Sequence, residues 1–141
     1  MNVKVAYYSV TGNTRKVAVS ISRAAGCTLS AIGHETLDGG RIDLLFLGAA
    51  VYATHDHGIH AAVRKYIAGL DPAQVGQVAL FSTGFIQSEA IAMMRRLLEG
   101  RGIAVAPDTF FCLGRFALFN MGHPNAKDLL AATAFAKKSI A

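Results

Sequence analysis

Short apolar runs alternate along the chain with segments in which apolar residues recur every three or four positions. Glycine, asparagine, serine or aspartate marks most changes from one pattern to the other. The apolar runs show little polar alternation, which is typical of strands covered on both faces of a sheet. Such strands, separated by helices, predict an α/β fold with a parallel sheet. The predicted strands are residues 3–8, 27–32, 43–47, 78–82 and 103–113.

The segments with helical spacing predict four helices, each with an apolar stripe toward the sheet. Gly26 is expected to end the first helix, and Ser88 to cap the third. Asn125 and Asp128 have the spacing of a capping box, which predicts the start of the last helix. Pro107 cannot donate to a strand ladder, so the fifth strand should kink there or lie at an edge. The predicted helices are residues 14–25, 59–70, 88–100 and 125–139.

Length and composition favour a single domain, residues 1–141. With 52% hydrophobic residues the chain can build a core without a disulfide or a metal. Cys27 and Cys112 lie far apart and form no CxxC pair, which argues against a zinc ribbon and a thioredoxin-like motif. Residues 33–41, between the second and third strands, are close to the minimum for a parallel crossover, so a full helix is not expected there.

Nothing in the sequence resembles a membrane span or a signal peptide. The longest apolar run, residues 44–53, has about half of the roughly 20 residues that a bilayer span requires. The first residues form a strand-like run and lack the serial pattern of a secretory signal. We therefore expect a cytoplasmic protein without a membrane span.

The chain is basic, with 14 Lys and Arg against 9 Asp and Glu and a net charge of +5 when histidine is neutral. This balance favours anionic ligands or protein partners with acidic docking surfaces. The cations are spread along the sequence in runs of at most two, whereas a nucleic-acid site normally gathers them on one face. No specific nucleic-acid partner is expected.

Residues 9–14, SVTGNT, join the first predicted strand to the first helix, at the edge where open α/β sheets bind ligands. The loop offers three hydroxyls, one amide and several backbone N–H groups at a helix N-terminus, which together suit a phosphate. Gly12 allows a tight turn, and Arg15 and Lys16 add positive potential. The loop matches neither GxxxxGK[ST] nor GxGxxG. The alternative is a turn whose Ser and Thr only cap the helix.

Thr-Gly-Asn-Thr after an apolar strand that ends in Tyr-Tyr-Ser resembles the FMN-phosphate loop of flavodoxins, and the likeness extends over the whole chain. It includes the length, the order of strands and helices, a GAAVY turn after the third strand and an STGF turn after the fourth. Residues 114–116 (GRF) and 122–125 (GHPN), with Asp128, are also similar to those of bacterial flavodoxin-family proteins. The resemblance implies a flavodoxin-like, doubly wound sheet of five parallel strands in the order 2-1-3-4-5, with helices on both faces.

The resemblance further implies FMN as the cofactor. The phosphate would be held by the side chains of Ser9, Thr11, Asn13 and Thr14 and by the amides of Val10 and Gly12. The flavin ring would be flanked by Ala50, Val51, Tyr52, Ala53 and Thr54 on one side and by Ser82, Thr83, Gly84 and Phe85 on the other. Tyr52 would stack on the ring, and Phe85 would be a second stacking aromatic. The alternative for both aromatics is ordinary packing at the edge of the core.

The implied function is that of an electron carrier between a reductase and an acceptor protein, which needs a held flavin but no catalytic acid or base. One alternative is an FMN-dependent NAD(P)H or quinone reductase; relatives of that kind are generally longer, with an inserted loop. Another is a module on the same fold that does not bind flavin. A phosphorylation receiver is disfavoured, because the first strand ends in Ser9 and the third in residues 48–50, without an acid.

Three features depart from the flavodoxin pattern or lie outside it. Flavodoxins are typically acidic, so we expect this basic chain to hold a less reducing flavin, because cations favour its anionic reduced form. The spacing of three histidines matches no metal motif, and these residues could be solvated loop histidines or form a rim that tunes the flavin or docks a partner. An apolar loop near the C-terminus could fold back on the core or form a docking surface. The histidines are His55, His57 and His60, and the loop residues are Phe116, Leu118, Phe119 and Met121.

Overall fold

The computed structural model describes residues 1–33, 40–52, 58–84, 89–115 and 120–141, with only the backbone at 51 and 52. Five parallel strands form the central sheet, and two short strands pair as a separate antiparallel hairpin. Along the chain the elements are β1 (Val3–Tyr7), α1 (Asn13–Ala25), β2 (Thr28–Ala31), β3 (Ile42–Gly48), β4 (Val51–Tyr52), β5 (Gly58–Ile59), α2 (Ala61–Ala68), β6 (Val75–Gly84), α3 (Ala90–Gly100), β7 (Phe110–Leu113) and α4 (Ala126–Ile140).

The strand order of the sheet is β2-β1-β3-β6-β7. Since β6 and β7 are its fourth and fifth strands, this confirms the expected order 2-1-3-4-5. The chain adds β2 on one side of β1 and then returns to add β3 on the other, so that Val5 lies opposite both Leu29 and Phe46. The carboxyl ends of β1 and β3 are therefore the point at which the strand order reverses, where folds of this kind bind ligands.

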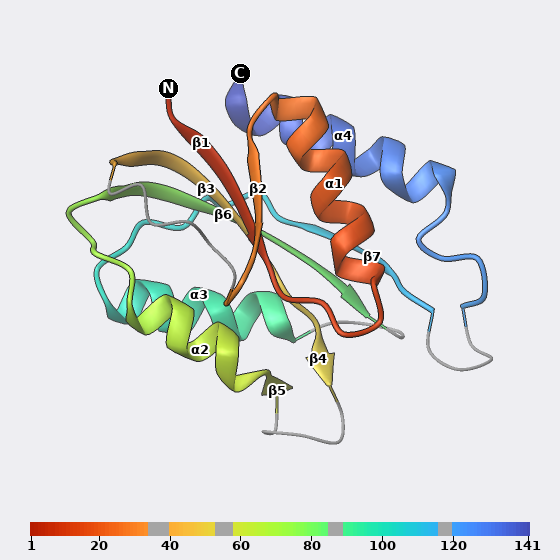
Figure 1. Cartoon of the computed structure of the whole chain (residues 1–141), viewed down its shortest axis with the longest axis horizontal. Coiled ribbons are helices and arrows are strands. Elements are labelled where there is room, and N and C mark those ends of the chain that lie inside the picture. The colour runs from red at the N-terminus through yellow and green to blue at the C-terminus, as the bar shows by residue number, and fades with distance from the viewer. Residues whose placement is uncertain (34–39, 53–57, 85–88, 116–119) are drawn as a thin grey trace.

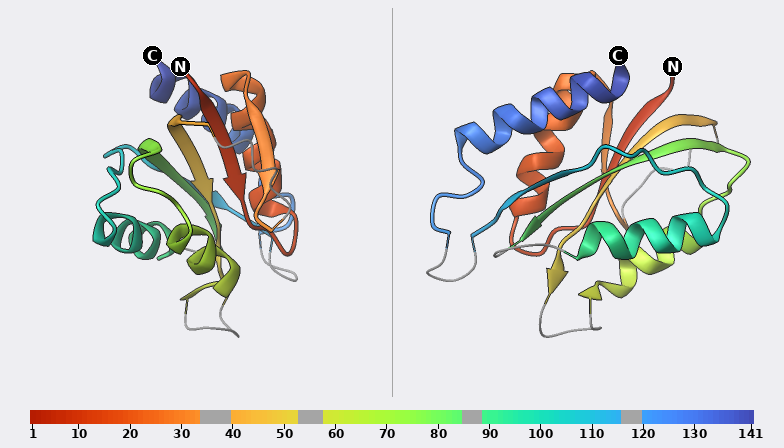
Figure 2. Two further views of the ribbon diagram at one scale, coloured as in Figure 1. Left: turned by 60° about the vertical axis from the view of Figure 1, so that its left-hand side comes forward. Right: turned by 180° about the vertical axis from the view of Figure 1, so that it is seen from behind.

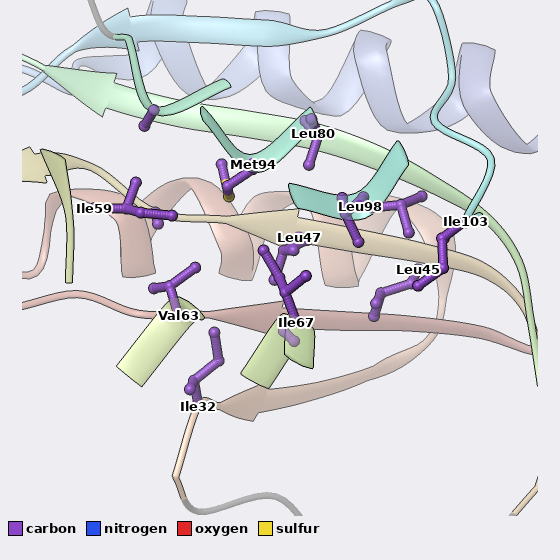
Figure 3. Close-up of a cluster of buried hydrophobic side chains, with 14 of the residues drawn as sticks. Ile32, Leu45, Leu47, Ile59, Val63, Ile67, Leu80, Met94, Leu98 and Ile103 are labelled. Carbon is purple, nitrogen blue, oxygen red and sulfur yellow. The ribbon is translucent and has the colours of Figure 1, made fainter. Parts of the chain in front are cut away.

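Helices cover both faces of the sheet. Figure 1 and Figure 2 show α1 and α4 on one face and α2 and α3 on the other. Side chains of neighbouring strand residues alternate between the two layers: Phe46 and Phe81 pack toward α1 and α4, while Leu47 and Leu80 pack toward α2 and α3. Figure 3 shows the cluster of buried side chains between the sheet and the helices α2 and α3, in which Ile67 of α2 lies beside side chains of the sheet.

The helix boundaries follow local signals in the sequence. Gly26, in a left-handed conformation with φ of +62°, ends α1 as predicted. Asn125 and Asp128 form the predicted capping box at the start of α4, with both reciprocal hydrogen bonds present. The N-cap of α3 is Glu89 rather than the predicted Ser88, which lies outside the described residues.

The predicted fifth strand is interrupted near Pro107, as expected from the missing N–H of proline. Val105 forms a single parallel bridge with Val78, and the ladder with β6 resumes at β7 on the edge of the sheet. Residues 34–39, most of the short crossover between β2 and β3, lie outside the described residues. Across the described ranges, no helix combines the length and the apolar character needed to cross a bilayer.

Candidate functional site

The loop between β1 and α1 ends in a glycine whose backbone is left-handed. Gly12 has φ of +92° and is the N-cap of α1, and its N–H donates to Ser9 Oγ at 3.0 Å. The first backbone hydrogen bond of the helix runs from Lys16 N to the Gly12 carbonyl at 3.1 Å. The N–H groups of residues 13–15 thus lie ahead of the helical ladder, and no side chain among the described residues caps them.

The electrostatics of this loop favour an anion. The first turn of α1 has no acidic residue, and the helix dipole adds partial positive charge there. A cavity of about 410 Å³ opens beside the loop. Its described lining residues are Tyr7, Tyr8, Ser9, Val10, Thr11, Gly12, Arg15, Ala31 and Ile32. This lining offers N–H and O–H donors and a guanidinium, and none of the described residues in it is a carboxylate, so the donor set fits a phosphate.

Two predicted site residues, Thr14 and Thr83, meet in the protein interior. Their hydroxyls lie 2.9 Å apart, and both side chains are almost fully buried. The neighbouring Ser82 donates its hydroxyl to the Ala49 carbonyl at 2.5 Å. These hydrogen bonds join the carboxyl end of β6 to the start of α1 and to the turn after β3. The structure therefore brings residues of all three predicted turns together.

Asn13 is held by the chain that follows β7. Its Nδ2 donates to the Arg115 carbonyl at 2.9 Å, across 102 positions of sequence. Gly114 permits this approach, because a Cβ at that position would lie 2.8 Å from Asn13 Nδ2. Arg115 N in turn donates to the His123 carbonyl at 3.0 Å. Gly114, Arg115 and His123, noted in the sequence only for their resemblance, thus support the loop at residues 9–14.

The start of α4 completes this support. His123 Nδ1 lies 2.7 Å from Asp128 Oδ2, and the same oxygen accepts from Asn125 N at 2.8 Å.

Nearby, burial raises the pKa of the Cys112 thiol to about 12, and the Asp128 carboxylate adds to the shift. The thiol is thus neutral near pH 7 and is not an activated nucleophile.

The hairpin of β4 and β5 follows β3 at the same edge of the sheet. Backbone pairing places residue 52 opposite Gly58, and His60 comes directly after the hairpin as the N-cap of α2. His60 Nδ1 accepts from Ala62 N at 3.0 Å, and its ring stacks on Tyr8 with centroids 4.4 Å apart. Tyr8 leads into the loop at residues 9–14, so His60 links the hairpin to that loop. The capping role of His60 was not predicted, since imidazole is not among the common N-caps.

Several predicted residues have no described side chain. The stacking roles of Tyr52 and Phe85 therefore stay predictions. Of the apolar C-terminal loop, Met121 is described and is 61% exposed. Within the described ranges, no three His, Cys, Asp or Glu side chains gather as a metal site would require. The predicted residues outside the described ranges are Ala53, Thr54, His55, His57, Phe85, Phe116, Leu118 and Phe119, and Val51 is described, like Tyr52, by its backbone alone.

Comparison with solved structures finds the same architecture. A flavodoxin from the domain Archaea superposes with a TM-score of 0.78 at 17% identity, over 98% of this chain and 95% of that one. Oxidised Flavodoxin 1 from Bacillus cereus superposes with a TM-score of 0.73 at 16% identity, over 99% of this chain and 97% of that one. Two-electron reduced flavodoxin from Megasphaera elsdenii superposes with a TM-score of 0.63 at 23% identity, over 96% of this chain and 98% of that one.

No family model matches the sequence, and no curated protein matches it either. The likeness is therefore one of structure, at sequence identities between 16% and 23% for these three flavodoxins. It extends along nearly the full length of each, and it agrees with the strand order and with the four helices placed on both faces of the sheet. The chain has the flavodoxin-like fold.

Proposed function

We propose that the protein binds FMN at the carboxyl edge of its sheet and transfers electrons between protein partners. The observation that carries the proposal is the start of α1, where three N–H groups precede the helical ladder behind a left-handed Gly12. An anion at this point would accept hydrogen bonds from these groups and would be favoured by the helix dipole. When bound, the flavin supplies the one-electron and two-electron chemistry that the side chains lack.

The contacts divide the loop residues into two groups. The Gly12 N–H, predicted to bind the phosphate, donates instead to Ser9 Oγ, which leaves the Ser9 O–H to donate outward. Ser9 and Thr11 would direct their hydroxyls to the phosphate together with the N–H groups at the start of α1, and Arg15 would add charge. The side chains of Asn13 and Thr14 are engaged with Arg115 and Thr83. We assign to these two the support of the loop, and to their N–H groups the contact with the phosphate.

The turn after β3 and the carboxyl end of β6 would hold the ring. β3 and β6 are neighbours in the sheet, with Gly48 opposite Phe81, so residues 50–52 and 82–84 lie at adjacent strand ends. Residues 82–84, predicted as a turn, are the last residues of β6 and pair with β7. A planar ring placed at these two strand ends would lie close to the loop at residues 9–14. Tyr52 and Phe85 are the proposed stacking residues.

Support for electron transfer comes from the structural neighbours. Solved flavodoxins of this fold are described as oxidised in one case and as two-electron reduced in another. The proposed donor and acceptor are therefore redox proteins, which would reach the flavin at the exposed edge of its site.

The first test is flavin binding. The purified protein is titrated with FMN and, separately, with riboflavin, which lacks the phosphate, while flavin fluorescence is followed. We expect FMN to bind and riboflavin to bind at least about tenfold more weakly, since the phosphate is the anchored group. Equal affinity for the two, or no uptake of FMN, would contradict the proposal. Reduction by dithionite but not by NAD(P)H would mark a carrier, whereas direct NAD(P)H oxidation would favour a reductase.

A matched pair of glycine variants locates the site. Gly12→Ala meets no neighbouring atom but places a side chain at φ of +92°, so its effect is on the backbone of the loop. The strain of about 1–2 kcal/mol should weaken FMN binding by about tenfold. Gly100→Ala is the control, because its Cβ also meets nothing and it ends α3 far from the loop. Equal FMN affinity in the two variants would place the flavin elsewhere.

A further inference from the structure

Four exposed cations lie on the segments around the proposed phosphate loop. Arg15 and Lys16 lie in the first turn of α1, Arg115 follows β7, and Lys127 lies in the first turn of α4. We call these four residues the basic rim. In Figure 1 the starts of α1 and α4 lie on the same side of the molecule as the end of β7.

Hydrogen bonds make these segments one continuous surface. Asn13, at the start of α1, bonds to the Arg115 carbonyl, and Arg115 N bonds to the His123 carbonyl. His123 in turn contacts Asp128, the neighbour of Lys127. The four cations are therefore carried by segments that touch one another, although they are spread over more than 100 positions of sequence.

Within the described segments that carry the rim, one acidic residue stands against the four cations. Among the described residues 8–16, 114–115 and 120–130, the acid is Asp128, and its carboxylate is occupied by His123 and by the Asn125 N–H. Three of the acids elsewhere lie beside cations of their own, in the pairs Arg41–Asp43, Arg95–Glu99 and Lys138–Asp108. Part of the net charge of +5 is therefore concentrated at the rim.

Apolar side chains are exposed within the same surface. Val10 is 64% exposed and Met121 is 61% exposed, and both belong to segments that carry the rim. Large exposed apolar side chains surrounded by charges are typical of surfaces where proteins associate transiently. The aliphatic side chains distinguish this surface from a nucleic-acid site, which relies on more numerous phosphate contacts than four cations provide.

We propose that the basic rim, together with the exposed side chains of Val10 and Met121, docks a protein partner that presents an acidic surface. The idea that electrons pass to the partner at this surface rests on the proposed function, because the rim lies beside the loop assigned to the flavin phosphate. The docking itself does not require a bound flavin. Opposite charges would steer the partner to this end of the molecule and orient it there.

The test uses an acidic plant-type ferredoxin as the probe protein. Isotope-labelled protein, both flavin-free and FMN-loaded, is titrated with the ferredoxin at low salt while backbone amide signals are followed. We expect changes at amides of residues 10–16 and 120–130, and weaker binding as salt rises from about 20 mM to about 300 mM. The variant Arg115→Glu/Lys127→Glu should bind at least about tenfold more weakly.

The control variant Arg96→Glu/Lys137→Glu makes the same change in net charge at exposed cations on α3 and at the far end of α4. It should bind like the unchanged protein, and amide spectra verify that both variants are folded. The inference is overturned if the control loses as much affinity as the rim variant, if salt has no effect, or if a short oligothymidylate binds the rim more tightly than the ferredoxin. Failure of FMN uptake with intact ferredoxin binding would overturn the proposed function alone.

Discussion

Three hydroxyl groups are buried where the carboxyl end of β6 meets α1 and the turn after β3. Thr14 and Thr83 bond to each other, and Ser82 bonds to the backbone of Ala49. Each would be costly to bury without its partner, because a lone hydroxyl in the interior loses its hydrogen bonds to water. At the residue scale, the site is therefore held by pairs rather than by single side chains.

The pair of threonines can be tested by removing one hydroxyl and then both. Thr83→Val keeps the shape of the side chain but leaves the Thr14 hydroxyl without its partner, and should lower the free energy of unfolding by about 1–3 kcal/mol. The double variant Thr14→Val/Thr83→Val should recover part of this loss. Urea unfolding of the three proteins measures the effect, and a fully additive double variant would show that the hydroxyls do not interact.

A second test at this scale concerns pH. The backbone N–H of Asn2, 2.6 Å from Asp43 Oδ2, lowers the pKa of that carboxyl below its ordinary value of 3.8, and Arg41 lowers it further. The folded protein thus favours the carboxylate. Its contribution to stability is present above about pH 4 and is lost as pH falls through the lowered value.

Denaturation of the protein and of Asp43→Asn between about pH 2 and about pH 6, a range chosen around the ordinary pKa of an aspartate, should show this loss. We expect the unchanged protein to be the more stable of the two at the upper end of the range and the difference to shrink toward the lower end. A difference that does not change with pH would mean that Asp43 acts through its shape rather than its charge.

The sequence predicted part of the candidate site at residue level. The loop at residues 9–14 could be recognised because its hydroxyls, glycine and helix start are adjacent in sequence. The partners of Asn13 and Thr14 could not, since Arg115 and Thr83 lie 102 and 69 positions away. Contacts of that range depend on the register of the sheet, which local patterns do not determine.

At the scale of elements, α2 shows how a short helix is anchored. Its eight residues begin after His60, whose Nδ1 accepts from Ala62 N and whose ring stacks on Tyr8. A helix this short gains little from its own hydrogen bonds, so capping and packing decide its stability. The predicted start at residue 59 is two positions early, because the periodic spacing includes Ile59, which belongs to β5.

Two substitutions separate the contributions of His60. His60→Ala removes both the cap and the stacking contact and should lower the free energy of unfolding by about 1–2 kcal/mol. His60→Asn keeps a capping oxygen but not the ring, so it should recover about half of that loss. Urea unfolding and hydrogen exchange of the Ala62 amide are the measurements. Equal destabilisation by the two variants would show that the cap contributes nothing.

Other elements differ in how visible they were in the sequence. The capping box at Asn125 and the break at Pro107 are local signals, and both predictions are confirmed. The hairpin of β4 and β5 was missed, because strands of two residues are too short to show a periodic pattern. Its pairing depends on where β3 and α2 place the two ends of the turn.

At the scale of the whole molecule, the alternation of apolar runs and helical segments was enough to predict a parallel sheet covered on both faces. It did not predict which strands are neighbours. That order came from the resemblance to flavodoxins, and the sheet confirms it. The spacing of apolar residues shows which face of each element is buried. The order of the strands in the sheet depends on the path of the connections between them, which the composition of the chain does not reveal.

Both edges of the sheet are short. β2 and β7 each have four residues, and before β7 the chain meets β6 only at the bridge between Val78 and Val105, with Pro107 in between. An edge with few consecutive free N–H and C=O groups is a poor template for a strand from another molecule. Copies of this protein should therefore resist joining edge to edge when concentrated, so that contacts with other molecules are left to side chains rather than to open backbone.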